Sequence, residues 1–464
     1  MSLLDLDELR SSRRAGRLVR IPPEMDVPVT PRVMRIVDSA AFRRLGTISQ
    51  LGLVGLVYPG ARHTRFEHSL GVYRLALLAL EQLAGDEAFA ASVSEQDARL
   101  LILAALLHDI GHWPYCHPIE DMRLPHIQRH EVNARQLICS GELAGIIGDQ
   151  WQTDPAEVAD LIAPMTGTEA TSPATNNPAT SDPATSAVVE SDGRALMRGL
   201  LSGPIDIDKL DYLQRDSLHA GVPYGRNFDQ RRLLGSLCVG PTGRDIGITL
   251  KGKTAAEMLV FSRYVMFSEV YWHHTVRAAT AMLQRLVFEL GERLKDSRTW
   301  LGWSDFQMQQ QLEAAVKEDS RLGRLFQGLF GPQRRPYKRL LAFNFAENPS
   351  AHQALARRSY GQLVVCAERL AQQLSRFTKK PLVSTELLID APPMKLEVQF
   401  RLSVRTEKNG FQPLANLSPV VRSLATEQFD NYVKKVHVFV AADRRRELDL
   451  SDAQLIEELL RATE

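Results

Sequence analysis

The sequence predicts a mostly α-helical protein with a smaller α+β part at its C-terminal end. From Leu100 to Leu107 every residue is Leu, Ile or Ala, so this segment is apolar on all sides and is expected to form a buried central helix. Segments that resemble strands are few and come late, at 387–392, 396–404 and 435–441. That order does not fit a doubly wound sheet. We therefore expect an N-terminal arm over 1–30, a helical domain over 31–300, and a helical and α+β region over 301–464.

Composition and charge narrow the class of protein. With 464 residues, 44% of them hydrophobic, the chain can bury a large core, and its formal net charge of +1 offers no field that would attract nucleic acid or a membrane surface. Its 4 cysteines form no CxxC pair, which is typical of a reducing compartment. No apolar stretch approaches the roughly 18 residues of a membrane span. We expect a cytoplasmic protein without a membrane partner, and the charge disfavours nucleic acid as a partner.

The first 50 residues predict an arm followed by a helix. Residues 1–30 carry scattered arginines and a proline-rich end, which favours a loose arm with a short strand or turn. Between Pro31 and Gln50 the apolar residues recur at roughly helical spacing, so a helix is expected to follow the arm.

Capping signals mark the starts of the next two helices. Thr64 and Glu67 have the spacing of a capping box, and the apolar residues behind them recur at helical spacing, so His68 is expected in the first turn of an amphipathic helix. Ser94 and Asp97 mark the start of the apolar helix in the same way, and the glycine and proline of HDIGHWP mark its end.

The adjacent His108 and Asp109 stand at the end of the apolar helix. A buried imidazole beside a buried carboxylate is costly without a partner, and a shared cation removes that cost. Neutral imidazole nitrogen and carboxylate oxygen both suit divalent zinc, iron or manganese. His68 can supply a third ligand. In a later segment, where Pro204 fits the first helical position, Asp208 is the best source of a fourth.

In this order the four residues resemble the H…HD…D signature of the HD-domain phosphohydrolases. Longer segments resemble the deoxynucleotide triphosphohydrolase (dGTPase-like) branch of that family, namely SQLG at 49–52, YPGARHTRFEHSLGV at 58–72, HDIGHWPYCH at 108–117, RHE at 129–131 and IDIDKLDYLQRD at 205–216. The resemblance implies an HD-type helical core and a divalent metal ion (Mn, Fe, Mg or Zn). It also implies hydrolysis of deoxynucleoside triphosphates to deoxynucleoside and inorganic triphosphate.

The resemblance further implies roles for side chains around the metal. The catalytic group would be His112, His117, Glu120 and His130, in which a histidine and a carboxylate move a proton to the leaving oxygen. The substrate would be bound by a second set of polar residues, namely Gln50, Arg65, Lys209, Tyr212, Asp216, Arg263 and Tyr271. Lysine and arginine suit phosphates, whereas tyrosine and aspartate can hold a sugar hydroxyl.

Two other functions stay open. One is another HD phosphohydrolase, acting on nucleoside monophosphates or on cyclic or signalling nucleotides. The other is a nucleotide- or nucleic-acid-binding regulator with little turnover. The three separated cations of Arg65, Lys209 and Arg263 suit a long polyphosphate, whereas a monoester needs fewer.

The remaining segments predict an insertion, a long helix and a basic patch. Residues 166–193 contain three PAT units and almost no large apolar group, so they are expected to form a disordered insertion in the helical domain. A short strand at 247 is expected to precede a long helix over 254–294, with Arg263, Phe267, Tyr271 and His274 along one stripe. Helices are expected over 300–380, around the basic segment 334–339, and over 418–433.

Assembly and control are expected to follow the resembled enzymes, which are commonly dimers, tetramers or hexamers with nucleotide sites between subunits. The long helix and the basic segment offer enough surface for a homo-oligomer, a dimer or larger. In nucleotide-activated members an aspartate matching Asp38, with an arginine eight positions later, recognises guanine. Here that later position is Gly46, so we expect activation by guanosine triphosphate to be absent or replaced by another allosteric nucleotide.

Overall fold

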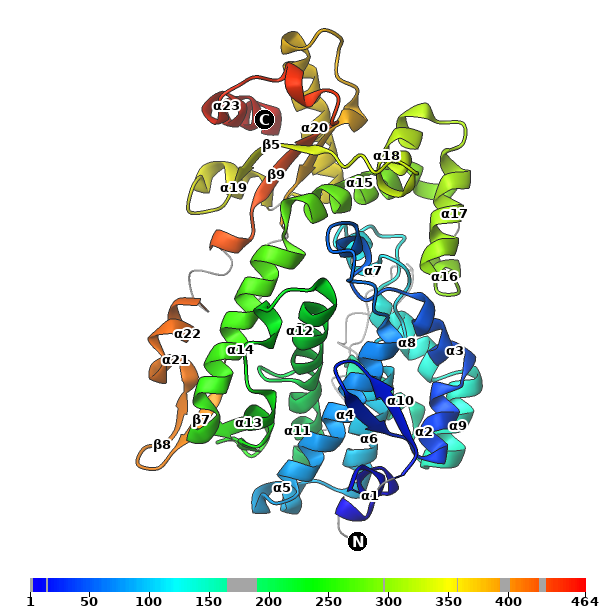
Figure 1. The fold of residues 1–464 in the computed structure, drawn as a ribbon, viewed down its shortest axis with the longest axis vertical. Coiled ribbons are helices and arrows are strands. Elements are labelled where there is room, and N and C mark those ends of the chain that lie inside the picture. The colour runs from blue at the N-terminus through cyan, green and yellow to red at the C-terminus, as the bar shows by residue number, and fades with distance from the viewer. Residues whose placement is uncertain are drawn as a thin grey trace, which may run out of the picture.

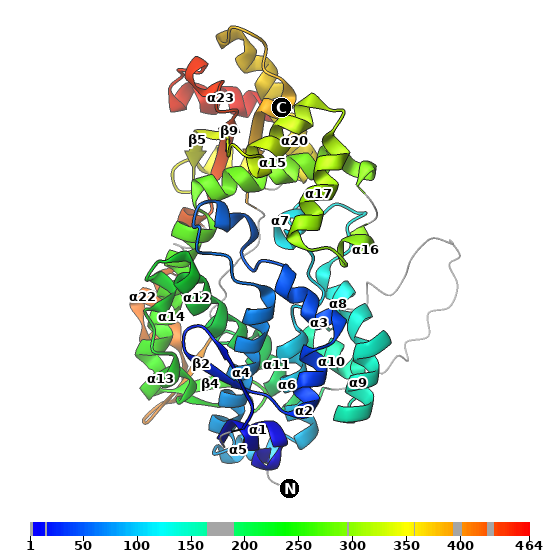
Figure 2. The same cartoon turned by 45° about the vertical axis from the view of Figure 1, so that its right-hand side comes forward.

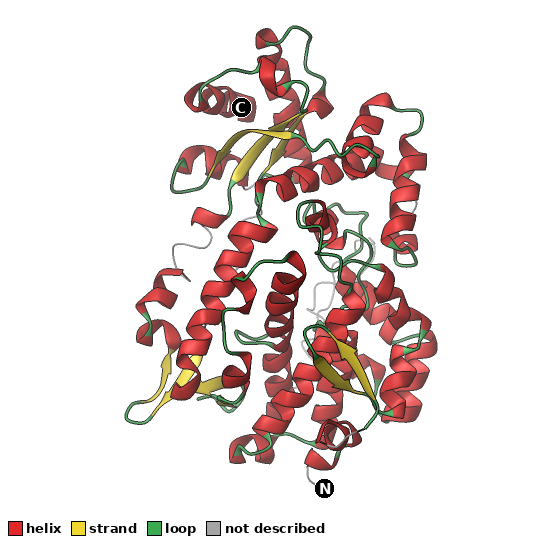
Figure 3. Ribbon diagram, viewed as in Figure 1, coloured by secondary structure: helices red, strands yellow, loops and turns green. Residues whose placement is uncertain are grey.

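The computed structural model describes residues 3–13, 16–164, 190–294, 297–356, 358–392, 401–424 and 431–464. Helices dominate this part of the chain and the strands form small sheets, so the predicted helical class with a C-terminal α+β region is confirmed (Figures 1 and 3). The predicted insertion at 166–193 lies outside the described residues up to 189. None of the described helices combines the length and the apolar character that a bilayer span needs.

The N-terminal segment is packed against the helices, so the prediction of a loose arm is wrong. It contains helix α1 (Asp7–Arg13) and an antiparallel hairpin of β1 (Leu18–Ile21) and β2 (Met25–Pro28). Leu9 is fully buried. Glu8 is buried too, and it accepts hydrogen bonds from Thr30 Oγ1 at 2.7 Å and from Arg32 Nε at 2.8 Å. A buried carboxylate needs such partners, and they fix the segment in place.

Residues 31–50 form short helices instead of the single predicted helix. The elements here are α2 (Pro31–Val37), α3 (Ala40–Arg44) and the 3-10 turn η2 (Leu45–Thr47), and a second 3-10 turn, η3 (Gly52–Leu56), follows. Ser39 starts α3, because its Oγ accepts a hydrogen bond from the backbone N–H of Phe42 at 3.3 Å. Local capping by serine therefore overrides the apolar periodicity.

The helices α4 (Arg65–Leu83) and α6 (Glu95–Leu107) pack against each other in the interior. Every residue from 100 to 107 is fully buried, as predicted, and α6 begins at the predicted capping box of Ser94 and Asp97. The side chain of Thr64 makes no capping hydrogen bond, so the capping box predicted for α4 is wrong.

Between residues 87 and 234 the chain also forms the helices α5 (Glu87–Ser92), α7 (Cys116–Glu120), α8 (His130–Ile138), α9 (Gly141–Trp151), α10 (Pro155–Ile162), α11 (Asp192–Ser202) and α13 (Gln230–Leu234), of which α10 and α11 pack on α6. Helix α12 (Ile207–Ala220) packs on α4. It starts later than predicted: Asp206 Oδ1 accepts the backbone N–H of Lys209 at 2.7 Å and caps the helix, so Pro204 is not its first residue.

The helix predicted over 254–294 is interrupted. Its parts are α14 (Lys253–Met266), the π-helical turn η6 (Phe267–Tyr271) and α15 (His274–Leu290). The chain changes direction between α14 and α15, and α15 passes over α7 (Figures 1 and 2). The predicted stripe is therefore broken: Tyr271 lies in the turn, and His274 is exposed beyond it.

Two sheets complete the described fold. One has the strand order β3-β4-β7-β8, with β3 (Leu237–Val239), β4 (Ile246–Thr249), β7 (Ser403–Thr406) and β8 (Gly410–Pro413). The predicted strand at 396–404 lies partly outside the described residues, and only from Ser403 does it form β7. Its parallel pairing with β4, in which Ile248 faces Val404, ties the C-terminal region back to the helical domain.

The second sheet has the order β5-β9-β6, with β5 (Lys338–Phe343), β6 (Leu387–Asp390) and β9 (Val436–Val440), so the strands predicted at 387–392 and 435–441 are confirmed. The helices of this region are α16 (Ser297–Trp300), α17 (Asp305–Val316), α18 (Ser320–Phe330), α19 (Pro349–Ala356), α20 (Tyr360–Leu374), α21 (Leu414–Leu417), α22 (Pro419–Ser423) and α23 (Asp452–Thr463). The helix predicted over 418–433 lies outside the described residues from 425 to 430. Arg277 on α15 binds both oxygens of Asp390, at 2.9 and 2.6 Å, and joins the sheet to the rest.

Candidate metal centre

Four side chains from three helices converge where the sequence predicts a metal ion. His68 comes from the first turn of α4, His108 and Asp109 follow α6, and Asp208 lies in the first turn of α12. His68 Nε2 lies 3.2 Å from His108 Nε2 and 3.0 Å from Asp208 Oδ1. Asp109 completes the group, with its Oδ2 4.0 Å from His68 Nε2 and its Oδ1 3.7 Å from His108 Nε2. We call these four residues the metal-facing cluster.

Hydrogen bonds fix which nitrogen of each imidazole faces the centre. His68 Nδ1 lies 2.8 Å from Asp211 Oδ2, and His108 Nδ1 lies 3.0 Å from the carbonyl oxygen of Ala105. Both acceptors require a proton on Nδ1, which leaves the lone pairs of the two Nε2 atoms facing each other. That arrangement is repulsive unless a cation lies between them. The donor set therefore fits a divalent metal ion.

The charges around the cluster also favour a cation. Burial lowers the pKa of His68, but hydrogen bonds to Asp208 and Asp211 outweigh it and raise the pKa to about 10, so in the absence of an ion a proton takes its place. Burial raises the pKa of Asp109, yet the charge of Arg65 holds it well below its ordinary value. Arg65 Nη1 donates to Asp109 Oδ2 at 2.7 Å, so this carboxylate stays ionised.

The predicted catalytic residues form a second group, here called the outer histidine cluster, made of His112, His117, His130 and Glu120. His112 Nε2 lies 3.3 Å from His117 Nε2, and His130 Nδ1 lies 2.8 Å from Glu120 Oε2. Burial and then the charge of Arg65 hold the pKa of His112 well below its ordinary value. The same two causes lower the pKa of His117 to about 4, although its side chain is 58% exposed. The cluster thus has a fixed inner imidazole and an accessible outer one.

Several of the predicted substrate-binding residues lie together on α12 and beside the π-helical turn. Tyr271 Oη donates to Asp216 Oδ2 at 2.6 Å. Burial raises the pKa of Tyr271 well above its ordinary value, the charge of Asp216 adds to this, and nearby Arg263 opposes it. Tyr212 is affected by Arg263 in the same way: burial raises its pKa and the guanidinium works against the rise. These residues form a partly buried polar group that contains a cation.

Lys209 and Gln50, also predicted to bind substrate, contact other parts of the protein. Lys209 Nζ binds Asp206 and the carbonyl oxygen of Gly203, so its ammonium group is already engaged by the protein. The backbone of Gln50 pairs with His63, and its side-chain Oε1 is buried without a hydrogen-bond partner among the described residues.

Sequence reasoning missed residues that hold the site in place. Arg44 Nη1 donates to the carbonyl oxygen of His112 at 2.6 Å, and its Nη2 binds that of Ile110, so one guanidinium clamps the loop after Asp109. Asp211, which lies 2.8 Å from His68 Nδ1, was also missed. Its position three residues after Asp208, one helical turn away, was the available signal.

Comparison with known families identifies the family to which these side chains belong. The model of the HD domain matches residues 65–216, which include all four residues of the metal-facing cluster. The model of the HD-associated region matches residues 228–457. The chain belongs to the HD-domain phosphohydrolase family. HD domains are metal-dependent, so the convergent histidines and aspartates have a resident metal ion as their ordinary partner, and the chain is a hydrolase by family.

Relatives of this HD-domain protein differ in length. Uncharacterized protein MJ1154 of Methanocaldococcus jannaschii is 26% identical over 437 residues, which cover 93% of this chain and 81% of that one. Human deoxynucleoside triphosphate triphosphohydrolase SAMHD1 is 28% identical over 271 residues, which cover 55% of this chain and 42% of the human one. The crystal structure of a hypothetical protein from Aquifex aeolicus has a TM-score of 0.67 at 25% identity and covers 96% of this chain and 99% of its own.

Proposed function

We propose that the chain hydrolyses deoxynucleoside triphosphates to deoxynucleoside and inorganic triphosphate with a divalent metal ion. The observation that carries this proposal is the layout of α12. Asp208, at the metal-facing cluster, and Asp216, bonded to Tyr271, lie about two helical turns apart on this helix. A carboxylate and a phenol suit a sugar hydroxyl. A nucleotide lying along α12 would thus present its phosphates to the metal and its sugar to the Asp216–Tyr271 pair.

The surrounding cations support a polyphosphate rather than a monoester. Arg65 adjoins the metal-facing cluster and Arg263 adjoins the tyrosines of α12 and the π-helical turn. A triphosphate carries several negative charges, and arginine is the side chain best suited to bind phosphate oxygens through paired hydrogen bonds. The relationship to proteins named as deoxynucleoside triphosphate triphosphohydrolases agrees with this choice.

The chain's own residues divide the chemistry between the two clusters. His68, His108, Asp109 and Asp208 would hold the ion, which when bound lowers the pKa of water and polarises a phosphoryl oxygen. Water attacks the α-phosphorus, and the bond from phosphorus to the 5′ oxygen of the sugar breaks. Burial and then the charge of Arg65 lower the pKa of His117 to about 4, so this exposed imidazole is neutral near pH 7 and is placed to pass a proton released by the attacking water to that oxygen.

His130, held by Glu120, orients the outer histidine cluster. Glu120 accepts both from His130 Nδ1 at 2.8 Å and from its backbone N–H at 2.6 Å, so ring and backbone are fixed together. Gln50, whose Oε1 has no hydrogen-bond partner among the described residues, is available to a sugar or base donor.

Product analysis tests the reaction. The full chain is incubated with Mn²⁺ and the four deoxynucleoside triphosphates, and the products are resolved by phosphorus NMR. Inorganic triphosphate is expected. Orthophosphate would instead indicate an HD phosphohydrolase of another class, and tight nucleotide binding without turnover would indicate a regulator. Asp208→Asn should abolish the reaction, whereas the matched change Asp149→Asn, at an exposed position of helix α9, should not.

We extend the proposal to assembly: the chain is a homo-oligomer, a dimer or larger, whose activity does not require guanosine triphosphate. Gly46 lacks the guanidinium that would recognise guanine, which leaves any allosteric nucleotide to other contacts. Light scattering with and without each nucleotide, paired with rate measurements, tests both parts. A monomer at micromolar concentration contradicts the first, and a large rate increase with guanosine triphosphate alone contradicts the second.

A further inference from the structure

A series of buried hydrogen bonds starts at the metal-facing cluster. Asp211 Oδ2 lies 2.8 Å from His68 Nδ1, and Arg215 donates to both oxygens of Asp211, at 2.8 Å from Nε and 2.7 Å from Nη2. Arg215 also donates to Glu67 Oε1 at 2.6 Å. The side chains of Asp211 and Arg215 are each only 2% exposed. The orientation of His68 therefore depends on a charged pair that solvent scarcely reaches.

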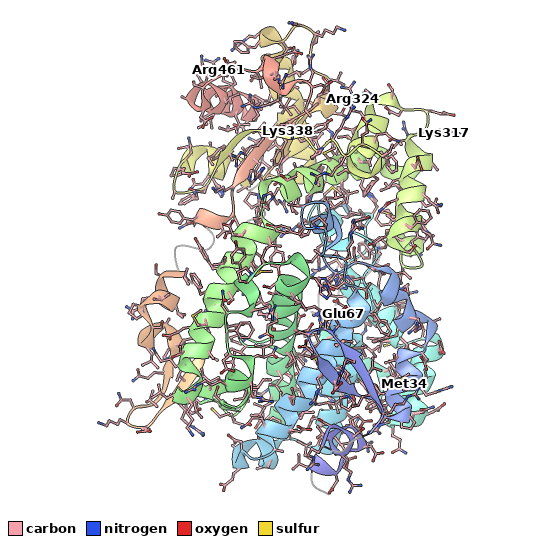
Figure 4. All side chains as sticks on the ribbon, viewed as in Figure 1. Met34, Glu67, Lys317, Arg324, Lys338 and Arg461 are labelled. Carbon is pink, nitrogen blue, oxygen red and sulfur yellow. The ribbon has the colours of Figure 1, made fainter. Side chains whose placement is uncertain are left out.

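Glu67, near the middle of the molecule in Figure 4, connects this pair to the Asp216–Tyr271 pair. Its Oε1 also lies 2.8 Å from His219 Nε2. The His219 ring stacks on His63, with centroids 4.4 Å apart and planes at 15°. His63 Nε2 in turn lies 2.8 Å from Asp216 Oδ1, whose other oxygen accepts from Tyr271. Contacts thus run without a break from the predicted sugar site to a predicted metal ligand.

A glycine in the middle of α4 makes room for this network. A Cβ at Gly71 would lie 2.0 Å from Asp211 Oδ1 and 2.4 Å from Arg215 Nη2. Glycine inside a helix is unfavourable relative to alanine. Gly71 therefore lowers the stability of α4 locally, but it leaves space for the Asp211–Arg215 pair one helical turn after His68.

We infer that Glu67, Arg215 and His219 are positioning residues that couple binding of the metal ion to binding of the nucleoside. All three act through other residues: on the ion side through Asp211 and His68, and on the nucleoside side through His63 and the Asp216–Tyr271 pair. The inference rests on the proposed function, which assigns the sugar to that pair. A ligand that orders one end of a continuous hydrogen-bond network leaves less to be ordered at the other, so the two ligands assist each other.

The coupling is measured by titrating the full chain with Mn²⁺, followed by electron paramagnetic resonance, with and without deoxyguanosine or deoxyadenosine. These probes carry no phosphate and so cannot reach the ion directly through one. In the wild type either nucleoside is expected to raise Mn²⁺ affinity by about tenfold, within the usual range of coupling factors. By reciprocity, Mn²⁺ should raise nucleoside affinity by the same factor.

Variants locate the coupling in the network. His219→Gln should retain Mn²⁺ binding but reduce the coupling factor to near one. Arg215→Lys keeps the charge but loses the two-bond clamp on Asp211, and should lower Mn²⁺ affinity itself by about 10- to 100-fold, as for other residues that orient a ligating histidine. His126→Gln, a change at an exposed histidine outside the network, should match the wild type in both measurements.

Folded Arg215→Lys and His219→Gln proteins with wild-type affinity and coupling would overturn the inference, because a role confined to folding changes neither quantity. Should Arg215→Lys fail to fold, His219→Gln, 21% exposed at its side chain, carries the test alone. A wild type that binds nucleoside and Mn²⁺ independently contradicts the coupling only. A wild type that binds no nucleoside contradicts the proposed function as well.

Discussion

The metal-facing cluster and the outer histidine cluster use the same residue types but hold them differently. Each contains two imidazoles whose Nε2 atoms face each other, 3.2 Å apart in the first and 3.3 Å in the second. In the first, His68 is 1% and His108 12% exposed, and each is anchored through Nδ1. In the second, His117 is 58% exposed at its side chain. Anchored imidazoles suit a resident ion, and an exposed one suits proton transfer to a substrate.

Geometry alone does not separate the two clusters. Donor atoms of His117, Glu120 and His130 also lie within 4.8 Å of one another, as close as a metal site would require. Charge separates them. Asp109, Asp208 and the supporting Asp211 bring three carboxylates to the metal-facing cluster, whereas in the other cluster Glu120 lies 2.8 Å and Glu131 3.5 Å from His130 Nδ1. A divalent ion is stabilised more by the first environment.

The largest expected effect comes from removing one carboxylate of the metal-facing cluster. Asp109→Asn keeps the shape of the side chain but removes the charge that Arg65 and the ion share. Bound metal should fall from about one ion per chain to near zero, and the rate by about a thousandfold or more, because a metal supplies several kcal/mol of transition-state stabilisation. Metal analysis, activity and helical circular dichroism on the same samples check this. A variant that keeps its metal would remove the distinction between the clusters.

The second prediction concerns the exposed member of the outer histidine cluster. His117→Gln should lower kcat by about 10²- to 10⁴-fold, the usual contribution of a general acid, while bound metal stays unchanged. The combination matters more than the loss of rate, since it separates proton transfer from metal binding. Loss of an ion from His117→Gln would show that the outer histidine cluster binds metal itself.

The two clusters also show what a sequence can reveal. The four residues of the metal-facing cluster were predictable because a buried His-Asp pair has few stable partners other than a cation. The residues that orient these four side chains were not predictable. Glu67 has capping-box spacing with Thr64, yet its carboxylate is taken by Arg215 and His219, 148 and 152 residues away. Local pattern cannot anticipate a charged partner that far along the chain.

The same limit applies to the fold. Apolar periodicity predicted the buried helix over 100–107 but missed the break between α14 and α15, because residues 267–271 continue the apolar pattern while the backbone widens into a π-helical turn. The buried Glu8 was missed for a similar reason: its pairing with Arg32 spans the hairpin between them. Ion pairs between residues far apart in the sequence hold both the N-terminal segment and the hydrogen-bond network behind His68 in place.

The smallest expected effect lies within the outer histidine cluster and depends on pH. Burial raises the pKa of Glu120, but the hydrogen bond from His130 outweighs it and lowers the pKa below 4.5. A depressed carboxyl pKa stabilises the fold above the unfolded value, near 4.5, and that contribution is lost as pH falls through the folded value. Glu120→Gln should therefore cost about 1.5–3 kcal/mol at pH 7, typical of a hydrogen bond to a charged group, and progressively less below pH 4.5.

Urea unfolding of wild type and Glu120→Gln at pH 7 and in steps below pH 4.5 gives this difference in the free energy of unfolding. Glu131→Gln is the matched control, because Glu131 pairs mainly with Arg129, whose side chain is 66% exposed, and such surface pairs contribute about 0–1 kcal/mol. A gap that stays constant with pH would mean that Glu120 acts by packing rather than by charge. Packing would then fix the outer histidine cluster, whereas charge fixes the metal-facing cluster, and the two clusters would differ in this respect too.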